Sequence, residues 1–235
     1  ETWGSDERVI EAARMSTGKG FLGWGAGWKC SRANCGWKTD QDDLTRSGPC
    51  SWCGCTEIVR QTGDEKLLRY LYENRHDTPF EMAGMVVEVQ APIIVFREWH
   101  RHRVPWSYNE ASARYAPLPA LDYLPTLERT MRDASKTNKQ AGTATGAAQL
   151  TEDNALDFLK RLELWQIEGE RVYQMGLRVG VPKELARLAM SVGRYSKMRA
   201  SANLRGWLHL FGLRMALNAQ EEFRVYAEAA GMKLI

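Results

Sequence analysis

All five cysteines of this 235-residue chain lie between Cys30 and Cys55. Disulfide-bonded secreted proteins usually distribute cysteines across the fold, whereas close clustering is typical of a metal site. The spacing Cys30-x4-Cys35-x14-Cys50-x2-Cys53 can supply four thiolates at tetrahedral positions. The spacing predicts a structural zinc site, with unliganded cysteines as the alternative. Cys55 is then spare, or it competes with Cys53.

The composition of the chain changes over residues 23–62. Four tryptophans join the cysteines there, glycines and polar residues are frequent, and no long apolar period is present. These features predict an inserted, zinc-ribbon-like module of small hairpins, and residues 1–22 and 63–235 form the other domain. Two purposes of this module stay open: stabilisation, or contact with DNA or another protein.

The overall composition is that of an ordinary globular protein, with 44% hydrophobic and 26% charged residues. The net charge of +3 gives no general argument for nucleic-acid binding. The longest apolar stretch, residues 91–96, is interrupted by Pro92 and is far too short to span a bilayer. The N-terminus lacks the apolar run of a secretion signal, so we expect a reducing, cytoplasmic setting.

The periodicity of apolar residues predicts an α+β fold, with a central, mostly antiparallel sheet packed against several helices. Residues 85–90 and 93–96 are β-branched and strand-like, and residues 133–149 have the composition of a loop. Asp64 is a candidate N-cap, and Thr78-Pro79-Phe80-Glu81 has a capping-box pattern. The predicted helices are 7–14, one near 67–71, 156–179, 182–190, 204–215 and 219–230.

A charged segment follows the predicted strand 93–96. Between Arg97 and Arg114 there are four arginines, two histidines and two carboxylates. A solvated loop with salt bridges would explain such a run, but the end of a strand is a common place for site residues. Arginine also suits bidentate phosphate recognition. The segment therefore predicts a site for a phosphorylated ligand.

The helix expected from Asn203 to Arg214 has two polar edges beside an apolar stripe. At about 100° per residue, Asn203 and Arg214 fall about 20° apart on one edge. Arg205 and His209 are i, i+4 neighbours on the opposite side. A core helix with a polar back is the simpler interpretation, but these edges also suit a helix between two ligand sites.

The charged segment resembles the signature of flavin-dependent thymidylate synthases through Arg101-His102-Arg103, Ser107, Asn109-Glu110, Ser112 and Arg114-Tyr115. The resemblance covers nearly the whole chain except residues 23–62. Its further segments, in chain order, are Ala12 to Ser16, Asp64 to Leu71, His76 to Glu81, Asn138-Lys139-Gln140, Lys183 to Arg187, and Asn203-Leu204-Arg205 through Arg214.

The resemblance implies conversion of dUMP to dTMP, with methylenetetrahydrofolate as carbon donor. It implies FAD as the hydride source, NADPH as the reductant, and a homotetramer whose active sites lie between subunits. Such an enzyme has no cysteine nucleophile, which agrees with the absence of cysteine outside residues 30–55. Membrane and nucleic-acid partners are not implied.

The resemblance also implies roles for individual residues, of which Arg214, His76 and Ser112 are the catalytic candidates. Arg187 and Arg114 suit the dUMP phosphate, and Arg214 suits the pyrimidine. The flavin-side residues are Ser16, Arg101, His102, Arg103, Asn109, Glu110, Asn203, Arg205 and His209. The nucleotide-side residues are Glu98, Ser112, Arg114, Arg187 and Arg214.

Three departures from the family pattern stand out. Three residues, Val104-Pro105-Trp106, separate Arg103 from the serine, where the family usually has two, and His209 stands where the family often has Asn. Residues 191–196 also differ from the turn of many relatives. One alternative function is a flavin- and folate-dependent enzyme acting on another pyrimidine, for instance a hydroxymethylase, with Glu98 as the discriminating residue. A zinc-ribbon nucleic-acid binding protein is the other alternative, against which the near-neutral charge argues.

Overall fold

The computed structural model describes residues 1–25, 28–39, 48–60, 63–132 and 150–234. The chain divides into two compact units. The large unit contains Glu1, Met85–Ala202 and Gly206–Ile235, and the small unit contains Thr2–Gly84 and Asn203–Arg205. The predicted loop 133–149, with its Asn138-Lys139-Gln140 motif, lies outside the described residues. The predicted boundary of the module at residues 23–62 stays a prediction.

The large unit is built on a sheet in which three strands follow the order β5–β7–β6. β6 pairs antiparallel with β7, so that Ser107 lies opposite Ser201 and Glu110 opposite Met198. The strands are β5 (Gly84–Pro92), β6 (Ser107–Glu110) and β7 (Tyr195–Asn203). The helices are α3 (Ile93–Trp99), α4 (Leu127–Met131), α5 (Glu152–Arg178), α6 (Lys183–Ala186), η4 (Arg187–Ala189), α7 (Leu204–Arg214) and α8 (Glu221–Gly231). The predicted α+β class is confirmed.

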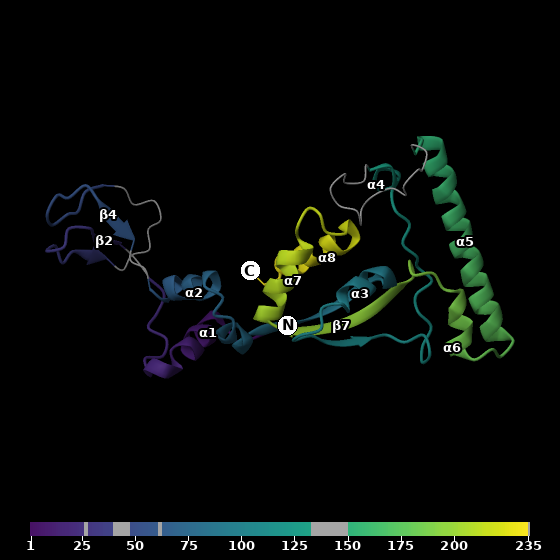
Figure 1. The fold of residues 1–235 in the computed structure, drawn as a ribbon, viewed down its shortest axis with the longest axis horizontal. Helices are drawn as coiled ribbons and strands as arrows, with labels where there is room; N and C mark the ends of the chain where they lie inside the picture. Colours follow the sequence, from purple (N-terminus) through teal and green to yellow (C-terminus); the bar gives the residue numbers. More distant parts are fainter. Residues whose placement is uncertain (26–27, 40–47, 61–62, 133–149, 235) are drawn as a thin grey trace. The chain divides into compact units, whose positions relative to one another are not determined.

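The core of the large unit lies between the sheet and the helices α3, α7 and α8, which lie above β7 in Figure 1. Trp99 of α3 and Trp207 of α7 are fully buried, and their ring centroids are 6.2 Å apart in an edge-to-face contact. Trp106 packs edge-to-face on Trp207 at 4.5 Å. Large aromatic rings therefore fix the start of α7 next to the end of α3.

The prediction of a strand over residues 93–96 is wrong, because these residues begin helix α3. Pro92 is the N-cap residue, and the buried side chains Val95, Phe96 and Trp99 have the spacing of one helix face. Burial of this face against the sheet outweighs the preference of β-branched residues for strands. The charged segment consequently follows a short helix rather than a strand.

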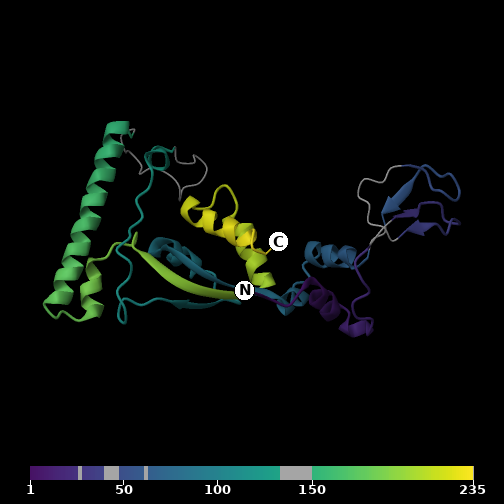
Figure 2. The ribbon, with the colours of Figure 1, turned by 180° about the vertical axis from the view of Figure 1, so that it is seen from behind.

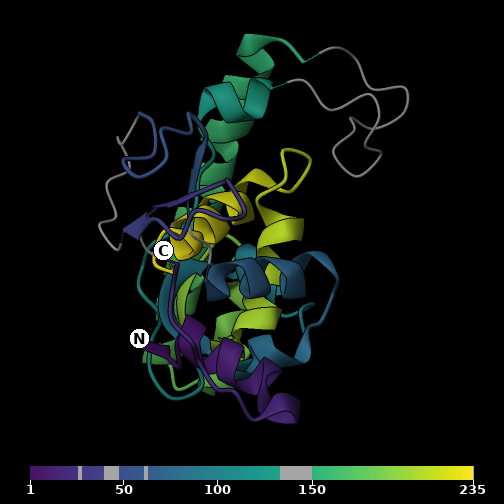
Figure 3. The ribbon, with the colours of Figure 1, turned by 90° about the vertical axis from the view of Figure 1, so that its left-hand side faces the viewer.

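The predicted helices of the last third of the chain are confirmed, although the one expected after Pro182 is divided into α6 and η4. The Thr151 side chain caps the long helix α5 by accepting a hydrogen bond from Asn154 N. α6 runs beside α5 in Figure 2, and α4 lies against α5 in Figure 3. Among the described helices, none is both long enough and apolar enough to cross a membrane.

The small unit contains β1 (Thr2–Trp3), α1 (Asp6–Ala13), η1 (Met15–Thr17), α2 (Asp64–Glu73) and η2 (Thr78–Met82). The predicted N-cap at Asp64 is wrong, since Gly63 caps α2 without a side-chain bond. Asp64 is buried instead, where it pairs with Arg14 and accepts a hydrogen bond from Leu22 N at 2.7 Å. A Cβ at Gly63 would lie 2.4 Å from Gly23 O, so this close approach requires glycine. These contacts join the two ends of the segment between Gly23 and Gly63.

We call the described part of residues 23–62 the knuckle. It contains a three-stranded antiparallel sheet in the order β3–β2–β4. The strands are β2 (Trp28–Cys30), β3 (Lys38–Thr39) and β4 (Ile58–Arg60). Its buried residues are only Cys30, Trp37 and Cys50. So small an apolar cluster cannot stabilise the knuckle by burial alone.

Candidate functional site

Arg214, at the end of α7, lies at the centre of a polar cluster. Its Nε donates to Nε2 of His102 at 2.9 Å, and its Nη1 donates to the Glu98 carboxylate at 3.1 Å. The guanidinium also lies over the Phe223 ring, 5.1 Å from the centroid. Glu98 pairs in addition with Arg101 at 3.5 Å. The structure thus places predicted nucleotide-side and flavin-side residues in one cluster.

His102 is the buried member of this cluster, with 7% of its surface exposed. Burial, reinforced by the positive charge of Arg214, lowers the pKa of His102 to about 4. The neutral ring can therefore accept the hydrogen bond from Arg214 at physiological pH. The ring of His209 lies 6.2 Å away. His102 consequently orients Arg214 without adding a second positive charge.

A separate cavity of about 370 Å³ lies in the large unit beside β6, α3 and η4. Ser112 and Arg187, both predicted nucleotide-side residues, line it together with Glu110. Its apolar wall is formed by Ile93, Leu118, Met190 and Val192. A volume near 400 Å³ with a few convergent polar groups is typical of small-molecule sites. The cavity therefore combines a hydroxyl, a guanidinium and an apolar surface.

Arg114 does not line this cavity, although the sequence predicts a phosphate contact. Its guanidinium lies 3.8 Å from the Glu184 carboxylate, and the side chain is half exposed. Arg187 contacts the backbone of Glu184 instead of its carboxylate: its Nε donates to the Glu184 carbonyl oxygen at 3.3 Å. Ser112 Oγ accepts a hydrogen bond from Arg114 N at 3.3 Å. The structure therefore brings Arg187 and Ser112 to the cavity and pairs Arg114 outside it.

Four predicted residues belong to the small unit. Arg205 donates to Glu81 at 2.7 Å and lies 3.5 Å from the Asp77 carboxylate. The exposed ring of His76 lies 5.8 Å from the Tyr70 ring. Arg205 is thus held against the segment that follows His76. Ser16 is exposed in η1, and Asn203 is the last residue of β7.

Three further predicted flavin-side residues are exposed. Arg101 has a side chain that is 70% exposed, and Arg103 and Asn109 lie on the surface. The inserted residue after Arg103 is accommodated by a turn in which Trp106 N donates to Arg103 O at 3.0 Å. Trp106 enters the core, while Val104 is 87% exposed. Arg101 and Arg103 face solvent on either side of buried His102.

The four predicted metal ligands cluster in the knuckle. The sulfur atoms of Cys30, Cys35, Cys50 and Cys53 all lie within 4.8 Å of one another. The Cys30–Cys53 distance is 3.5 Å and the Cys35–Cys50 distance is 3.7 Å. A tetrahedral zinc with Zn–S bonds of about 2.3 Å has sulfur–sulfur edges of about 3.8 Å. Cys55 lies apart, 3.7 Å from Ser31 Oγ.

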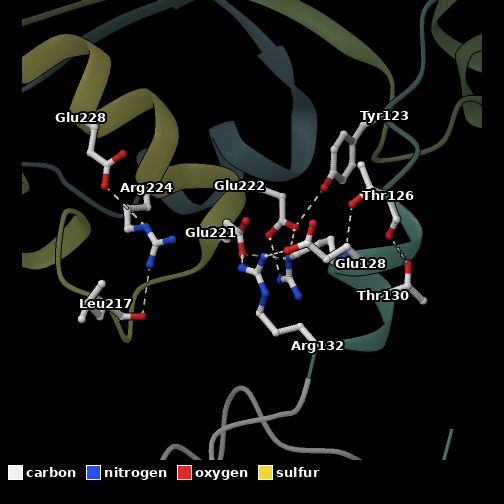
Figure 4. Close-up of polar contacts among 11 residues, drawn as sticks. Tyr123, Thr126, Glu128, Thr130, Arg132, Leu217, Glu221, Glu222, Arg224 and Glu228 are labelled. Carbon is white, nitrogen blue, oxygen red and sulfur yellow. Dashed lines mark hydrogen bonds and ion pairs between the residues drawn. The ribbon is translucent and has the colours of Figure 1, made fainter.

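A second cavity of the large unit, of about 400 Å³, contains none of the predicted site residues. Its polar wall is an ion-pair network in which Glu222 accepts hydrogen bonds from Arg129 at 2.9 Å and from the Tyr123 hydroxyl at 3.1 Å. Burial beside Glu222 raises the pKa of Tyr123 to about 12. Figure 4 shows Tyr123 directed at Glu222, and Arg132 directed at neighbouring Glu221. These charged groups pair with one another, so we interpret this wall as a structural ion-pair network rather than a ligand site.

Sequence reasoning missed two contributors to the site. Arg97 lines the 370 Å³ cavity, although the sequence predicts only a general charged segment there. The sequence predicts that Glu81 belongs to a capping box, but η2 has no side-chain cap and Glu81 holds Arg205. In a helix, Arg97 projects in a different direction from the buried residues Val95 and Phe96. A helical interpretation of this segment would therefore have indicated that the Arg97 side chain points away from the core.

A family model described as "Thymidylate synthase complementing protein" matches residues 1–234. The flavin-dependent thymidylate synthase of Streptomyces coelicolor is 39% identical over 150 residues, which cover 63% of this chain and 58% of that protein. The enzyme of the same name from Thermus thermophilus is 33% identical over 226 residues, covering 96% of this chain and 66% of the relative. The chain therefore spans about three fifths of the length of the curated relatives that it matches.

Two solved structures also resemble this chain. The chain resembles PolB of Streptomyces cacaoi, a UMP/dUMP methylase bound with 5-Br dUMP, with a TM-score of 0.69 and 28% identity. The match covers 100% of this chain and 87% of PolB. The form of PolB bound with 5-Br UMP matches with the same TM-score at 26% identity.

Proposed function

The chain belongs to the thymidylate synthase complementing protein family, and from this premise we propose that it catalyses the flavin-dependent reductive methylation of dUMP to dTMP. The observation that carries the proposal is the cavity lined by Ser112 and Arg187, in the same unit as the Arg214 cluster. Arg97 lines the cavity, and Glu98, the next residue of α3, holds Arg214. Two adjacent residues of α3 therefore contact the cavity and the candidate catalytic guanidinium, respectively.

The nucleotide would bind with its phosphate at the cationic side of the cavity. Arg187 offers a guanidinium that stays protonated, as recognition of a dianion requires. Ser112 Oγ accepts from the Arg114 backbone, so its O–H remains free to donate. The substrate of the Streptomyces cacaoi relative, which its name gives as UMP or dUMP, supports a pyrimidine nucleotide here.

The flavin would bind at Arg101, Arg103 and neighbouring residues, and the curated relatives are flavin-dependent by name. The two exposed guanidiniums flank buried His102, an arrangement that suits a pyrophosphate. The family resemblance adds flavin-side candidates in each unit. In the large unit they are Asn109, His209 and Glu110, which also lines the cavity, and in the small unit Ser16, His76, Asn203 and Arg205. FAD, when bound and reduced by NADPH, supplies the hydride, and methylenetetrahydrofolate supplies the carbon.

Arg214 would activate the uracil without a covalent enzyme bond. His102 and Glu98 engage its Nε and Nη1, which leaves the N–H groups of Nη2 for a ligand. A donor fixed in this way stabilises negative charge that develops on a uracil carbonyl. All five cysteines lie in the small unit, and none of the large-unit residues is a thiol. The arrangement favours polarisation over thiolate attack.

We propose further that Cys30, Cys35, Cys50 and Cys53 bind one structural zinc. The two sulfur–sulfur distances of 3.5 and 3.7 Å are close to the edge expected for tetrahedral zinc thiolate, about 3.8 Å. All five cysteines are free of disulfides, as a reducing compartment would keep them. Four thiolates close the tetrahedron, so the proposed zinc is structural rather than catalytic.

A homotetramer is the proposed assembly. Helix α5 leaves several large apolar side chains exposed, a pattern typical of an association surface. They include Leu156, Phe158, Leu164, Trp165, Ile167, Val172 and Met175, each at least 44% exposed. An active site completed by a second subunit would also explain why Asn109 and Arg103 face solvent.

A second candidate is the same chemistry on another pyrimidine nucleotide. The structural relative PolB is a methylase of both UMP and dUMP, which favours UMP as the alternative substrate. Glu98 is the residue to test, because its carboxylate sets the position of Arg214. A hydroxymethylated product would be a further variant.

The decisive experiment is turnover of purified protein with FAD, NADPH, methylenetetrahydrofolate and either dUMP or UMP. We expect dTMP from dUMP, identified by mass, and no product when the folate is omitted. Methylation of UMP alone would assign the second candidate function. Failure to modify either nucleotide with flavin bound would contradict the proposed reaction.

A further inference from the structure

The charged side chains at the end of α3 divide between two surroundings. Arg97 lines the 370 Å³ cavity with Ser112 and Arg187. Glu98 instead contacts Arg101 and Arg214 outside this cavity lining. Successive helix residues point about 100° apart, so adjacent residues of α3 reach different sites. The Arg97 side chain therefore lies at the cavity, whereas the carboxylate of the next residue, Glu98, pairs with other arginines.

Arg97 differs from its neighbours in its electrostatic partners. Arg101 and Arg214 pair with Glu98, and Arg114 pairs with Glu184. In contrast, no ion pair or hydrogen bond joins the Arg97 side chain to another residue within the described parts of the chain, and this side chain is exposed. An arginine without a carboxylate partner keeps its five donors for a ligand.

The cavity lining contains two guanidiniums and one carboxylate. Arg187 makes only a hydrogen bond to the Glu184 backbone carbonyl, so its charge is not neutralised by that contact. Glu110 contributes the carboxylate. The balance favours an anion, and the geometry of guanidinium donors suits two oxygens of one phosphate. Ser112 adds a hydroxyl donor.

We propose that Arg97 is a phosphate-binding residue of the nucleotide site, which it shares with Arg187. The inference rests on the proposed function, because it assumes that a nucleotide occupies the cavity. It adds Arg97 to the phosphate contacts that the sequence predicts at Arg187 and Arg114. The apolar wall of Ile93, Met190 and Val192 then faces the remainder of the nucleotide.

The test compares binding of dUMP with binding of deoxyuridine, which lacks the phosphate, to flavin-loaded protein. Arg97→Ala should weaken dUMP binding by about tenfold to a hundredfold, as expected for loss of a charge-assisted hydrogen bond. Deoxyuridine binding should be unchanged, so the preference for the phosphorylated ligand falls. Arg97→Lys should recover part of this preference, because it keeps the charge but not the bidentate geometry.

Arg199→Ala is the matched control, since Arg199 is an exposed arginine of the same unit that pairs with Glu88 at 3.3 Å. It should leave both dissociation constants unchanged. Equal weakening of dUMP and deoxyuridine by Arg97→Ala, or no weakening at all, would overturn the proposal. A wild-type protein that binds dUMP but forms no dTMP would contradict the proposed function and leave the Arg97 measurement valid.

Discussion

The knuckle and the large unit are stabilised in different ways. The large unit buries fourteen residues in one cluster around Trp99 and Trp207, whereas the knuckle cluster has three buried residues, two of them cysteines. Apolar burial contributes roughly 25 cal/mol per Å², so the large unit has a core of its own. The knuckle lacks such a core, so we expect its fold to depend on the proposed zinc.

This difference separates the proposed zinc site from the proposed nucleotide site. The proposed nucleotide contacts belong to the large unit, whereas the cysteines belong to the small one. Perturbing the sulfur atoms should therefore change folding of the knuckle, and perturbing the arginines should change binding or turnover. Each prediction below tests one side of this division, beginning with the largest effect.

The largest effect should come from loss of the metal. Cys50→Ser removes a buried sulfur that lies 3.7 Å from Cys35 Sγ, and it should abolish zinc binding. Structural zinc sites supply about 10–16 kcal/mol of apparent binding energy, far more than so small a cluster can replace. Metal analysis should give about one zinc per wild-type chain and almost none in the variant.

Hydrogen exchange would localise the consequence of this substitution. Amides of residues 28–39 and 48–60 should lose protection, while those of β7 and α7 should keep it. Metal-free protein with a protected knuckle would contradict the zinc proposal. Equal loss of protection in both units would show that the two are not independently stabilised.

Arg214→Ala should cause the next largest effect. Loss of one preorganised charge-stabilising donor typically reduces turnover by roughly a hundredfold or more. The substitution also leaves Glu98 and His102 without their shared partner, so kcat and the dissociation constant of dUMP should be measured separately. A variant with unchanged kcat would exclude Arg214 from catalysis.

The sequence predicted the elements that depend on local patterns. The long helix α5 was predicted from its leucine spacing, and the α+β class is confirmed. The helix α3 was missed, because Ile93 to Phe96 are β-branched or aromatic and the burial of Val95, Phe96 and Trp99 is a tertiary effect. Asp64 was misread for a similar reason, as its partner Arg14 lies 50 residues away.

The sequence predicts which residue types belong to the candidate site, but it does not predict which side chains form ion pairs with one another. Arg214 and Glu98 are 116 residues apart, and their ion pair follows from the packing of α7 against α3. Local spacing likewise could not show that Arg114 pairs with Glu184 while Arg97 lines the cavity. The motif indicates which residue types belong to a site, and the fold determines which arginine meets which carboxylate.

A pair of arginines tests whether the nucleotide and the flavin bind at separate sites. Arg187 lines the cavity of the large unit, and Arg205 pairs with Glu81 and Asp77 in the small unit. Arg187→Ala should weaken dUMP binding by about tenfold, the scale of a lost charge-assisted hydrogen bond, and leave flavin binding nearly intact. Arg205→Ala should show the reverse pattern in titrations of FAD and dUMP. If both variants lose flavin alone, the two-site division is wrong.

The smallest effect should come from Cys55→Ser, the counterpart of Cys50→Ser. Cys55 Sγ lies outside the four-sulfur group and contacts Ser31 Oγ at 3.7 Å and Glu57 O at 3.6 Å. A serine hydroxyl can make the same two hydrogen bonds, so the knuckle should keep its fold and its zinc. Turnover should stay close to that of wild type, because the proposed reaction uses no thiol nucleophile. Zinc content and kcat, measured on the same preparation, separate the two claims: loss of zinc alone would place Cys55 among the ligands in exchange with Cys53. A covalent adduct between dUMP and Cys55, detected by mass, would refute the mechanism, because it would require the small unit to supply the nucleophile that the large unit lacks.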